Sequence, residues 1–151
     1  MIAQVFQAQE VLQGYAHKDD TTFFLLSEKQ YTISQVSRVV LTGSFRNWSQ
    51  DMDDPGWQLK PLGDGLWMLA LANPNYENIP PQAEFKFRID DGKWLDPPTM
   101  APNAKGGNFI FLSNVISPQI KAEIIGEKAI WAYIDGLERP LDPQAYRLLN
   151  A

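Results

Sequence analysis

Apolar and polar residues alternate along parts of this chain with the two-residue period of a β-strand. The clearest case is the segment 83–89, whose odd positions are apolar and whose even positions are charged. A strand with this pattern buries one face and leaves the other in solvent. The segment therefore predicts a half-buried strand whose polar face carries Glu84, Lys86 and Arg88.

Other short runs are apolar and rich in β-prone residues, and turn sequences separate them. Gly63-Asp64-Gly65 and Asp90-Asp91-Gly92 favour tight β-hairpins, while the Gly-, Pro- and Asn-rich stretches predict loops. Many short strands with frequent turns are typical of an all-β sandwich. The expected strands are residues 22–26, 36–42, 57–61, 66–72, 83–89, 93–95 and 108–112.

The two ends of the chain depart from this pattern. Residues 2–12 carry an apolar stripe near helical spacing before Gly14, and a short helix or an edge strand fits them equally well. Near the other end, residues 120–126 and 129–134 indicate another hairpin. Asp142-Pro143 then begins a short helix, with Asp as its N-cap and Pro in its first turn.

A length of 151 residues fits one domain with a short appendage. We expect an N-terminal extension at 1–20, a β-sandwich at 21–114 and a C-terminal hairpin and helix at 115–151. This appendage fits either a docked terminus or the start of a second β-domain. The second interpretation predicts a longer protein in which this chain is the front piece.

Charge and composition limit the kinds of partner, cofactor and metal that the chain is expected to bind. The chain has 13 basic and 18 acidic residues, and this acidic balance argues against a nucleic-acid partner. It has no cysteine, which removes disulfides and thiol catalysis, and a single histidine, His17, cannot form a multi-histidine metal site. We expect no cofactor and no metal.

Membrane and leader signals are absent from the sequence pattern. No apolar run approaches the roughly 18 residues that a membrane helix needs, so we expect no membrane partner. The first twelve residues have neither a basic cluster nor a long apolar stretch, so they do not read as a signal peptide. The compartment stays open.

Catalysis by this chain is not expected. Its acidic clusters lie in turn sequences, where adjacent carboxylates usually form turns rather than active sites. The sequence has no nucleophile–base motif, phosphate loop or metal-ligand spacing. The clusters considered are Asp51, Asp53 and Asp54, then Asp90 and Asp91, and Asp96.

Three segments together resemble carbohydrate-binding module family 48: VVLTGSFRNWS at 39–49, EFKFRIDDGKWLDPP at 84–98 and GGNFIFL at 106–112. The resemblance covers about residues 36–112. It implies an immunoglobulin-like early-set β-sandwich. Such domains precede the barrel in glycoside hydrolase family 13 enzymes such as pullulanases and branching enzymes. They also form the glycogen-binding domain of the AMP-activated protein kinase β subunit.

The resemblance also implies a sugar site made of Trp48, Lys86 and Trp94, with Asn108 at the Asn of a Gly-Asn pair. Indole rings are broad apolar plates that stack on the C–H face of glucose, and lysine donates hydrogen bonds to hydroxyls at the rim. The sequence departs from the family at Gly107, where glycogen-binding members carry another Asn. It also has no leucine in the preceding loop.

The resemblance therefore implies a non-catalytic module for α-1,4-glucans such as starch or glycogen, attached to a family 13 type enzyme. Two alternatives stay open: a structural N-terminal domain that packs on a catalytic barrel without sugar, or a kinase-β-like regulatory interaction domain. Trp48 and Trp94, if coplanar and open on one face, would favour sugar binding. Trp57, Trp67 and Trp131 are expected to pack in cores.

Overall fold

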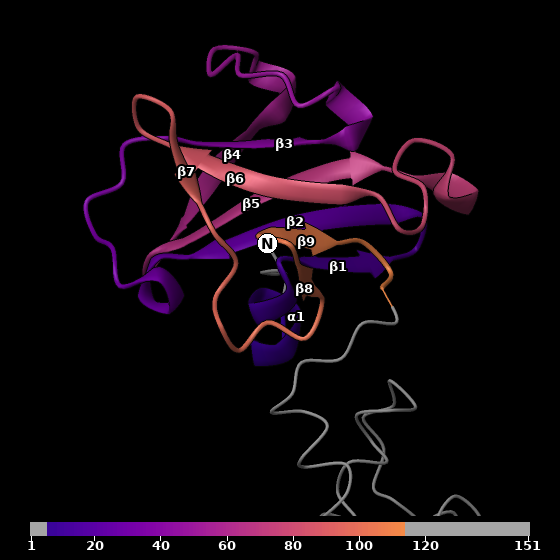
Figure 1. Cartoon of the computed structure of the whole chain (residues 1–151), viewed down its shortest axis with the longest axis horizontal. Coiled ribbons are helices and arrows are strands. Elements are labelled where there is room, and N and C mark those ends of the chain that lie inside the picture. Colours follow the sequence, from indigo (N-terminus) through magenta and orange to yellow (C-terminus); the bar gives the residue numbers. More distant parts are fainter. Residues whose placement is uncertain (1–5, 114–151) are drawn as a thin grey trace, which may run out of the picture. The chain divides into compact units, whose positions relative to one another are not determined.

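The alternating segment forms β6, Glu84–Ile89, in a computed structural model that describes residues 6–113 of the chain. β3, Val39–Gly43, pairs with one edge of β6. Two short strands share its other edge: β7, Lys93–Leu95, and β9, Asn108–Ile110. β6 is therefore the central strand of its layer (Figure 1).

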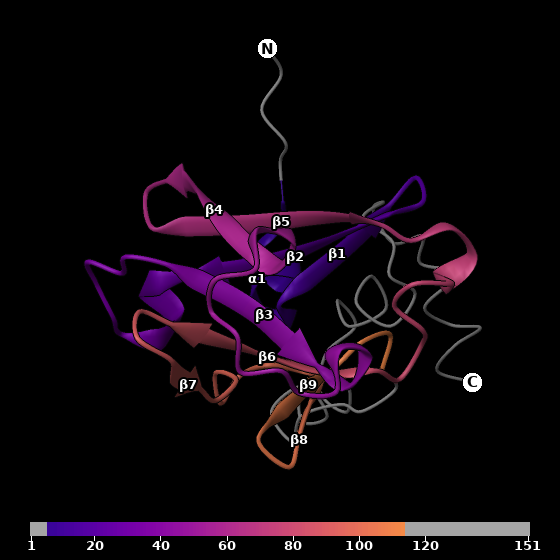
Figure 2. The ribbon, with the colours of Figure 1, turned by 90° about the horizontal axis from the view of Figure 1, so that it is seen from above.

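A second layer is built on β2, Thr21–Ser27. It lies between β1, Tyr15–Lys18, and β5, Leu66–Ala72, in antiparallel register. Figure 2 shows the strands of the two layers one above the other. The chain therefore has the predicted all-β fold, an immunoglobulin-like sandwich of antiparallel strands.

β4, Gln58–Gly63, connects the two layers. Its first residues pair with β3, and its later residues pair with β5. The register shifts between Pro61 and Gly63, where a proline cannot donate to the ladder. The change of partner itself comes earlier, between Leu59, which pairs with β3, and Lys60, which pairs with β5. β8 is a two-residue strand, Ala104–Lys105, that pairs with β9.

The segment before Gly14, for which the sequence favoured a short helix and an edge strand equally, contains a helix, α1, Ala8–Gln13. Gly14 ends it with a left-handed φ of 84°, as the sequence predicts. β1 follows at once, so the sheet begins before residue 21. Short 3₁₀ turns lie at Glu28–Tyr31, Ser44–Arg46, Pro55–Trp57 and Pro74–Tyr76. The predicted hairpin at 120–134, the helix at Asp142 and Trp131 lie outside the described residues.

Phenylalanine rings fill the space between the layers. Phe85 and Phe109, on neighbouring strands, stack with ring centroids 4.9 Å apart. Trp67 is 7% exposed and donates from Nε1 to Glu28 at 2.8 Å, which confirms its packing role. Trp57 is half-buried and stacks on Phe45. Among the residues that the structure describes, the fully buried aromatic ones are Phe24, Phe85, Phe87, Phe109 and Phe111.

Candidate functional site

The outer face of β6 is more covered than its charged residues suggest. The Lys86 side chain keeps 15% of its surface exposed, and Arg88 keeps 9%. Trp94 lies directly opposite Arg88 in the antiparallel pair of β6 and β7, and opposed residues share a face. The hairpin register therefore places the Trp94 indole on the same face as Lys86.

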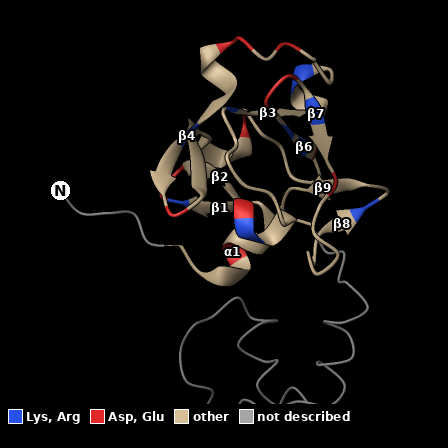
Figure 3. Cartoon of the chain, turned by 90° about the vertical axis from the view of Figure 1, so that its left-hand side faces the viewer, with Lys and Arg blue, Asp and Glu red and all other residues tan. Residues whose placement is uncertain are grey.

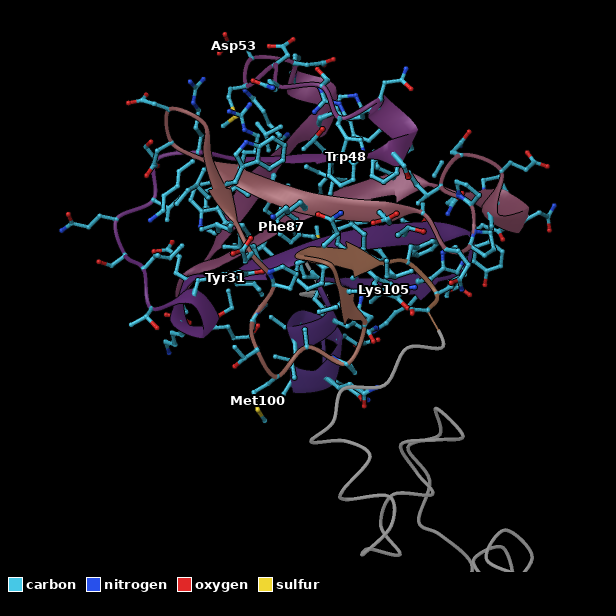
Figure 4. The ribbon with its side chains drawn as sticks, viewed as in Figure 1. Tyr31, Trp48, Asp53, Phe87, Met100 and Lys105 are labelled. Atoms are coloured by element: carbon cyan, nitrogen blue, oxygen red, sulfur yellow. The ribbon has the colours of Figure 1, made fainter. Side chains whose placement is uncertain are left out.

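Trp48 reaches this face from the loop that follows β3. Asn47 and Trp48 both have left-handed backbone angles, with φ of 52° and 55°, which is unusual for a bulky side chain. The Trp48 amide donates to the Gly43 carbonyl at 2.9 Å, and the Asn47 amide donates to Ser44 at 3.2 Å. Backbone hydrogen bonds thus stabilise a strained loop that folds back over the sheet. Figure 4 places Trp48 and the core residue Phe87 on either side of the β6 ribbon.

The two indoles meet at one open hollow of about 530 Å³. Their centroids are 6.3 Å apart, and the ring planes are tilted by 53° rather than coplanar. Trp94 is 38% exposed and Trp48 is half-buried, so neither ring is sunk in the core. The hollow is lined by Trp48, Gln50, Lys86, Trp94 and Asn108.

The structure thus brings together all four residues that the family resemblance singled out. Gln50 joins them and was not foreseen, because an exposed glutamine in a loop has no sequence signal of its own. Lys86 and Asn108 come from paired parts of the sheet, while Trp48 and Gln50 come from one loop.

Polar groups at the hollow already have partners. Lys86 Nζ forms an ion pair with Asp96 Oδ1 at 2.7 Å, and Asn108 Nδ2 donates to Glu84 Oε1 at 3.0 Å. A Cβ added at Gly107 would lie 3.7 Å from Lys86 Nζ. The glycine therefore leaves the space beside the ammonium free of a side chain. The arrangement offers N–H donors and an amide next to two apolar plates.

The β6–β7 turn below Trp94 is fastened to the segment before β3. The backbone N–H and the hydroxyl of Ser37 donate to Asp90 Oδ1 at 2.7 and 2.8 Å. These bonds hold the pKa of the Asp90 carboxyl below its usual range. Arg38 Nε donates to the Asp90 carbonyl at 2.8 Å. The hairpin that carries Trp94 is thus anchored at its tip.

Charged residues lie on β6 and β7 and in the neighbouring loops (Figure 3). Within residues 6–113, no three His, Asp or Glu side chains gather in a way that could hold a metal ion. In the same part of the chain, no helix has the length and apolar character needed to cross a bilayer.

No family model matches this chain, and no curated protein matches it. Solved structures with a similar arrangement of strands include a Salmonella typhimurium chain that is provisionally named an alpha amylase. The two chains are 19% identical, with a TM-score of 0.45, over 66% of this chain and 14% of the other. The chain therefore spans a small part of the length of that protein.

Proposed function

We propose that this domain binds α-1,4-linked glucan chains, such as those of starch or glycogen, and that it catalyses no reaction on them. One observation carries the proposal. Two indoles, Trp48 from the loop after β3 and Trp94 from strand β7, face the same open hollow beside the ammonium of Lys86.

The tilt between the rings favours a curved ligand. Each indole can stack on the C–H face of one glucose unit. Plates inclined at 53° match successive sugars whose faces turn relative to one another, as they do in a coiled α-1,4 chain. A flat β-1,4 chain would require plates that are nearly coplanar. Lys86, Asn108 and Gln50 supply hydrogen-bonding groups for hydroxyls along the rim.

The carboxylates beside the hollow favour binding over hydrolysis. A glycosidase needs one carboxylic acid with a raised pKa, and burial is the usual way to raise it. Asp96 is 82% exposed and paired with Lys86, and Glu84 is exposed and accepts from Asn108. These carboxylates orient the two polar side chains of the hollow instead.

A second candidate function rests on the opposite layer. Leu62 is 48% exposed and lies in an apolar groove of about 450 Å³ along β4 and β5. Such a groove fits a structural domain that packs on a catalytic barrel of the family 13 type without holding sugar. Sugar titration separates the two candidates, because only the first requires binding at the tryptophans.

The test is a titration of the full chain with maltoheptaose, followed by calorimetry and tryptophan fluorescence. We expect binding with quenching. We also expect a loss of about tenfold or more in affinity for Trp94→Ala and for Trp48→Ala, because a truncated tryptophan anchor costs about 2 kcal/mol. Trp57→Phe is the matched control, since Trp57 stacks on Phe45 and does not line the hollow.

Cellohexaose, a β-1,4 glucan of similar size, is the control ligand and should bind much more weakly. Absence of maltoheptaose binding at millimolar concentration would overturn the proposal and leave the packing function. Equal binding of both sugars would contradict the argument from ring tilt.

A further inference from the structure

Arg88 is a nearly buried cation whose hydrogen bonds go to backbone carbonyls of two loops. Its Nε and Nη2 donate to the Gly92 carbonyl at 3.0 and 2.7 Å. Its Nη1 donates to the Gln50 carbonyl at 2.6 Å. Gln50 lies two residues after Trp48, and Gly92 lies two residues before Trp94. One guanidinium on the central strand therefore bonds both to the loop that carries Trp48 and to the turn that precedes Trp94.

The same group also contacts one of the indoles. The Arg88 Cζ atom lies 4.7 Å from the centroid of the Trp94 ring, within the range of a cation–π interaction. This contact follows from the pairing of β6 and β7, because the register of the hairpin sets Arg88 opposite Trp94. Because Arg88 is only 9% exposed, water screens this attraction little.

We propose that Arg88 is a positioning residue that sets the distance and tilt between Trp48 and Trp94. It is not placed to touch a ligand, because the hollow is lined by other side chains. It acts by fixing two loops before a ligand arrives, which lowers the entropy cost of binding. The consequence for sugar affinity rests on the proposed function, whereas the consequence for ring geometry does not.

Arginine is required for this arrangement rather than any cation. The planar fork donates to two carbonyls at once, one of them through two nitrogens, and stacks on an aromatic ring. Lysine at position 88 could reach one carbonyl as a point donor, and it could not hold both loops in a fixed relation. A lysine variant should therefore keep the charge and the fold while it loosens the tryptophan pair.

The test measures ring geometry without any sugar. Two indoles 6.3 Å apart couple their electronic transitions and give an exciton couplet in circular dichroism. Trp48→Phe and Trp94→Phe establish which part of the signal comes from this pair. We expect Arg88→Lys to lose at least half of that couplet while the β-sheet signal and cooperative unfolding are retained. Arg88→Met should lose more.

Arg38→Met is the matched control. Arg38 also donates to a carbonyl of the β6–β7 turn, at Asp90, and it pairs with Asp53. The pair with the 84% exposed Asp53 is weak because solvent screens it, and Ser37 still holds the turn when Arg38 is replaced. The couplet should be retained in this variant. Maltoheptaose affinity, measured in parallel, should fall by about tenfold in Arg88→Lys and stay near the wild-type value in Arg38→Met.

A full couplet in folded Arg88→Lys overturns the inference. If Arg88→Met fails to fold, the lysine variant decides. A lost couplet in Arg88→Lys, together with no sugar binding by the wild type, supports the positioning role and removes only the proposed function. If Arg88→Lys and Arg38→Met lost the same fraction of the exciton couplet, the hairpin would be loosened in general, and the specific role of Arg88 would be overturned.

Discussion

Gly92 leaves the space that the guanidinium of Arg88 occupies. A Cβ built on Gly92 would lie 2.5 Å from Arg88 Nη2, closer than real Cβ atoms approach. The backbone φ of Gly92 is +114°, in a region that L side chains rarely adopt. The glycine of the Asp-Gly turn therefore permits the turn and also leaves room for the cation that bonds to this turn and to the loop of Trp48.

Gly92→Ala should destabilise the domain and disturb the tryptophan pair. The backbone strain and the displaced guanidinium together should cost about 2–4 kcal/mol of unfolding free energy. Gly63→Ala is the matched control, because Gly63 has a φ of +102° with no atom within 4 Å of an added Cβ. It should show the strain alone and an unchanged exciton couplet. Urea unfolding and circular dichroism measure both effects, and equal behaviour of the two variants would contradict the steric argument.

The strands that sequence patterns predict have either an apolar or alternating run of their own or, like the three-residue β7, a turn motif directly before them. β5 begins and ends where its apolar run does, at Leu66 and Ala72. The unpredicted strands are β1 and β8. β1 is the four-residue sequence YAHK after a helix, and its pairing with β2 rather than its own pattern makes it a strand. β8 has two residues, too few for any alternation.

The meeting of the candidate site residues was predictable only in part. An Asp-Gly turn between two strands indicates a hairpin, and the hairpin brings Trp94 to the face of Lys86. The tilt of the indoles was not predictable, because it depends on left-handed angles at Asn47 and Trp48. The position of Arg88 on the polar face was visible, yet its bonds to carbonyls of two loops arise only from tertiary structure.

Lys86→Met should weaken glucan binding with little effect on stability. Methionine keeps the apolar stem and removes the N–H donors. The ion pair of Lys86 with the 82% exposed Asp96 contributes less than about 1 kcal/mol, since solvent screens such pairs. Calorimetry with maltoheptaose should show an affinity loss of about three- to tenfold.

The control for this variant is Lys93→Met. Lys93 is an exposed lysine on the same strand as Trp94, but it pairs with the core residue Ile89 and so faces away from the hollow. Its replacement should leave affinity unchanged. An unchanged affinity in Lys86→Met would remove the ammonium from the binding site while leaving the stacking argument intact.

Asn73 should be among the most sensitive positions for stability. Its side chain is fully buried and donates to Thr22 Oγ1 and to the Ile79 carbonyl, at 3.0 and 2.9 Å. Its Oδ1 accepts from the backbone amides of Asn78 and Ile79. Asn73→Ala leaves these groups without a partner and should cost about 3 kcal/mol. Thr22→Val removes one hydroxyl, which accepts from Asn73 and also bonds to His17 Nδ1 at 2.7 Å, and should cost about 1–2 kcal/mol by urea unfolding; a loss larger than that of Asn73→Ala would contradict this account.

Asp90 should make the stability of the domain fall at acidic pH. Hydrogen bonds from Ser37 lower the pKa of the folded carboxyl below the value of about 3.9 that it has in an unfolded chain. A group whose folded pKa is lowered stabilises the fold above its unfolded pKa, and that contribution is lost as pH falls through the folded pKa. Asp90→Asn should therefore flatten the decline of unfolding free energy as pH falls below about 5. Asp91→Asn, in the same turn but without the bonds to Ser37, should keep the wild-type slope. If both variants followed the wild-type curve, the Ser37–Asp90 contact would have no role in anchoring the hairpin that carries Trp94.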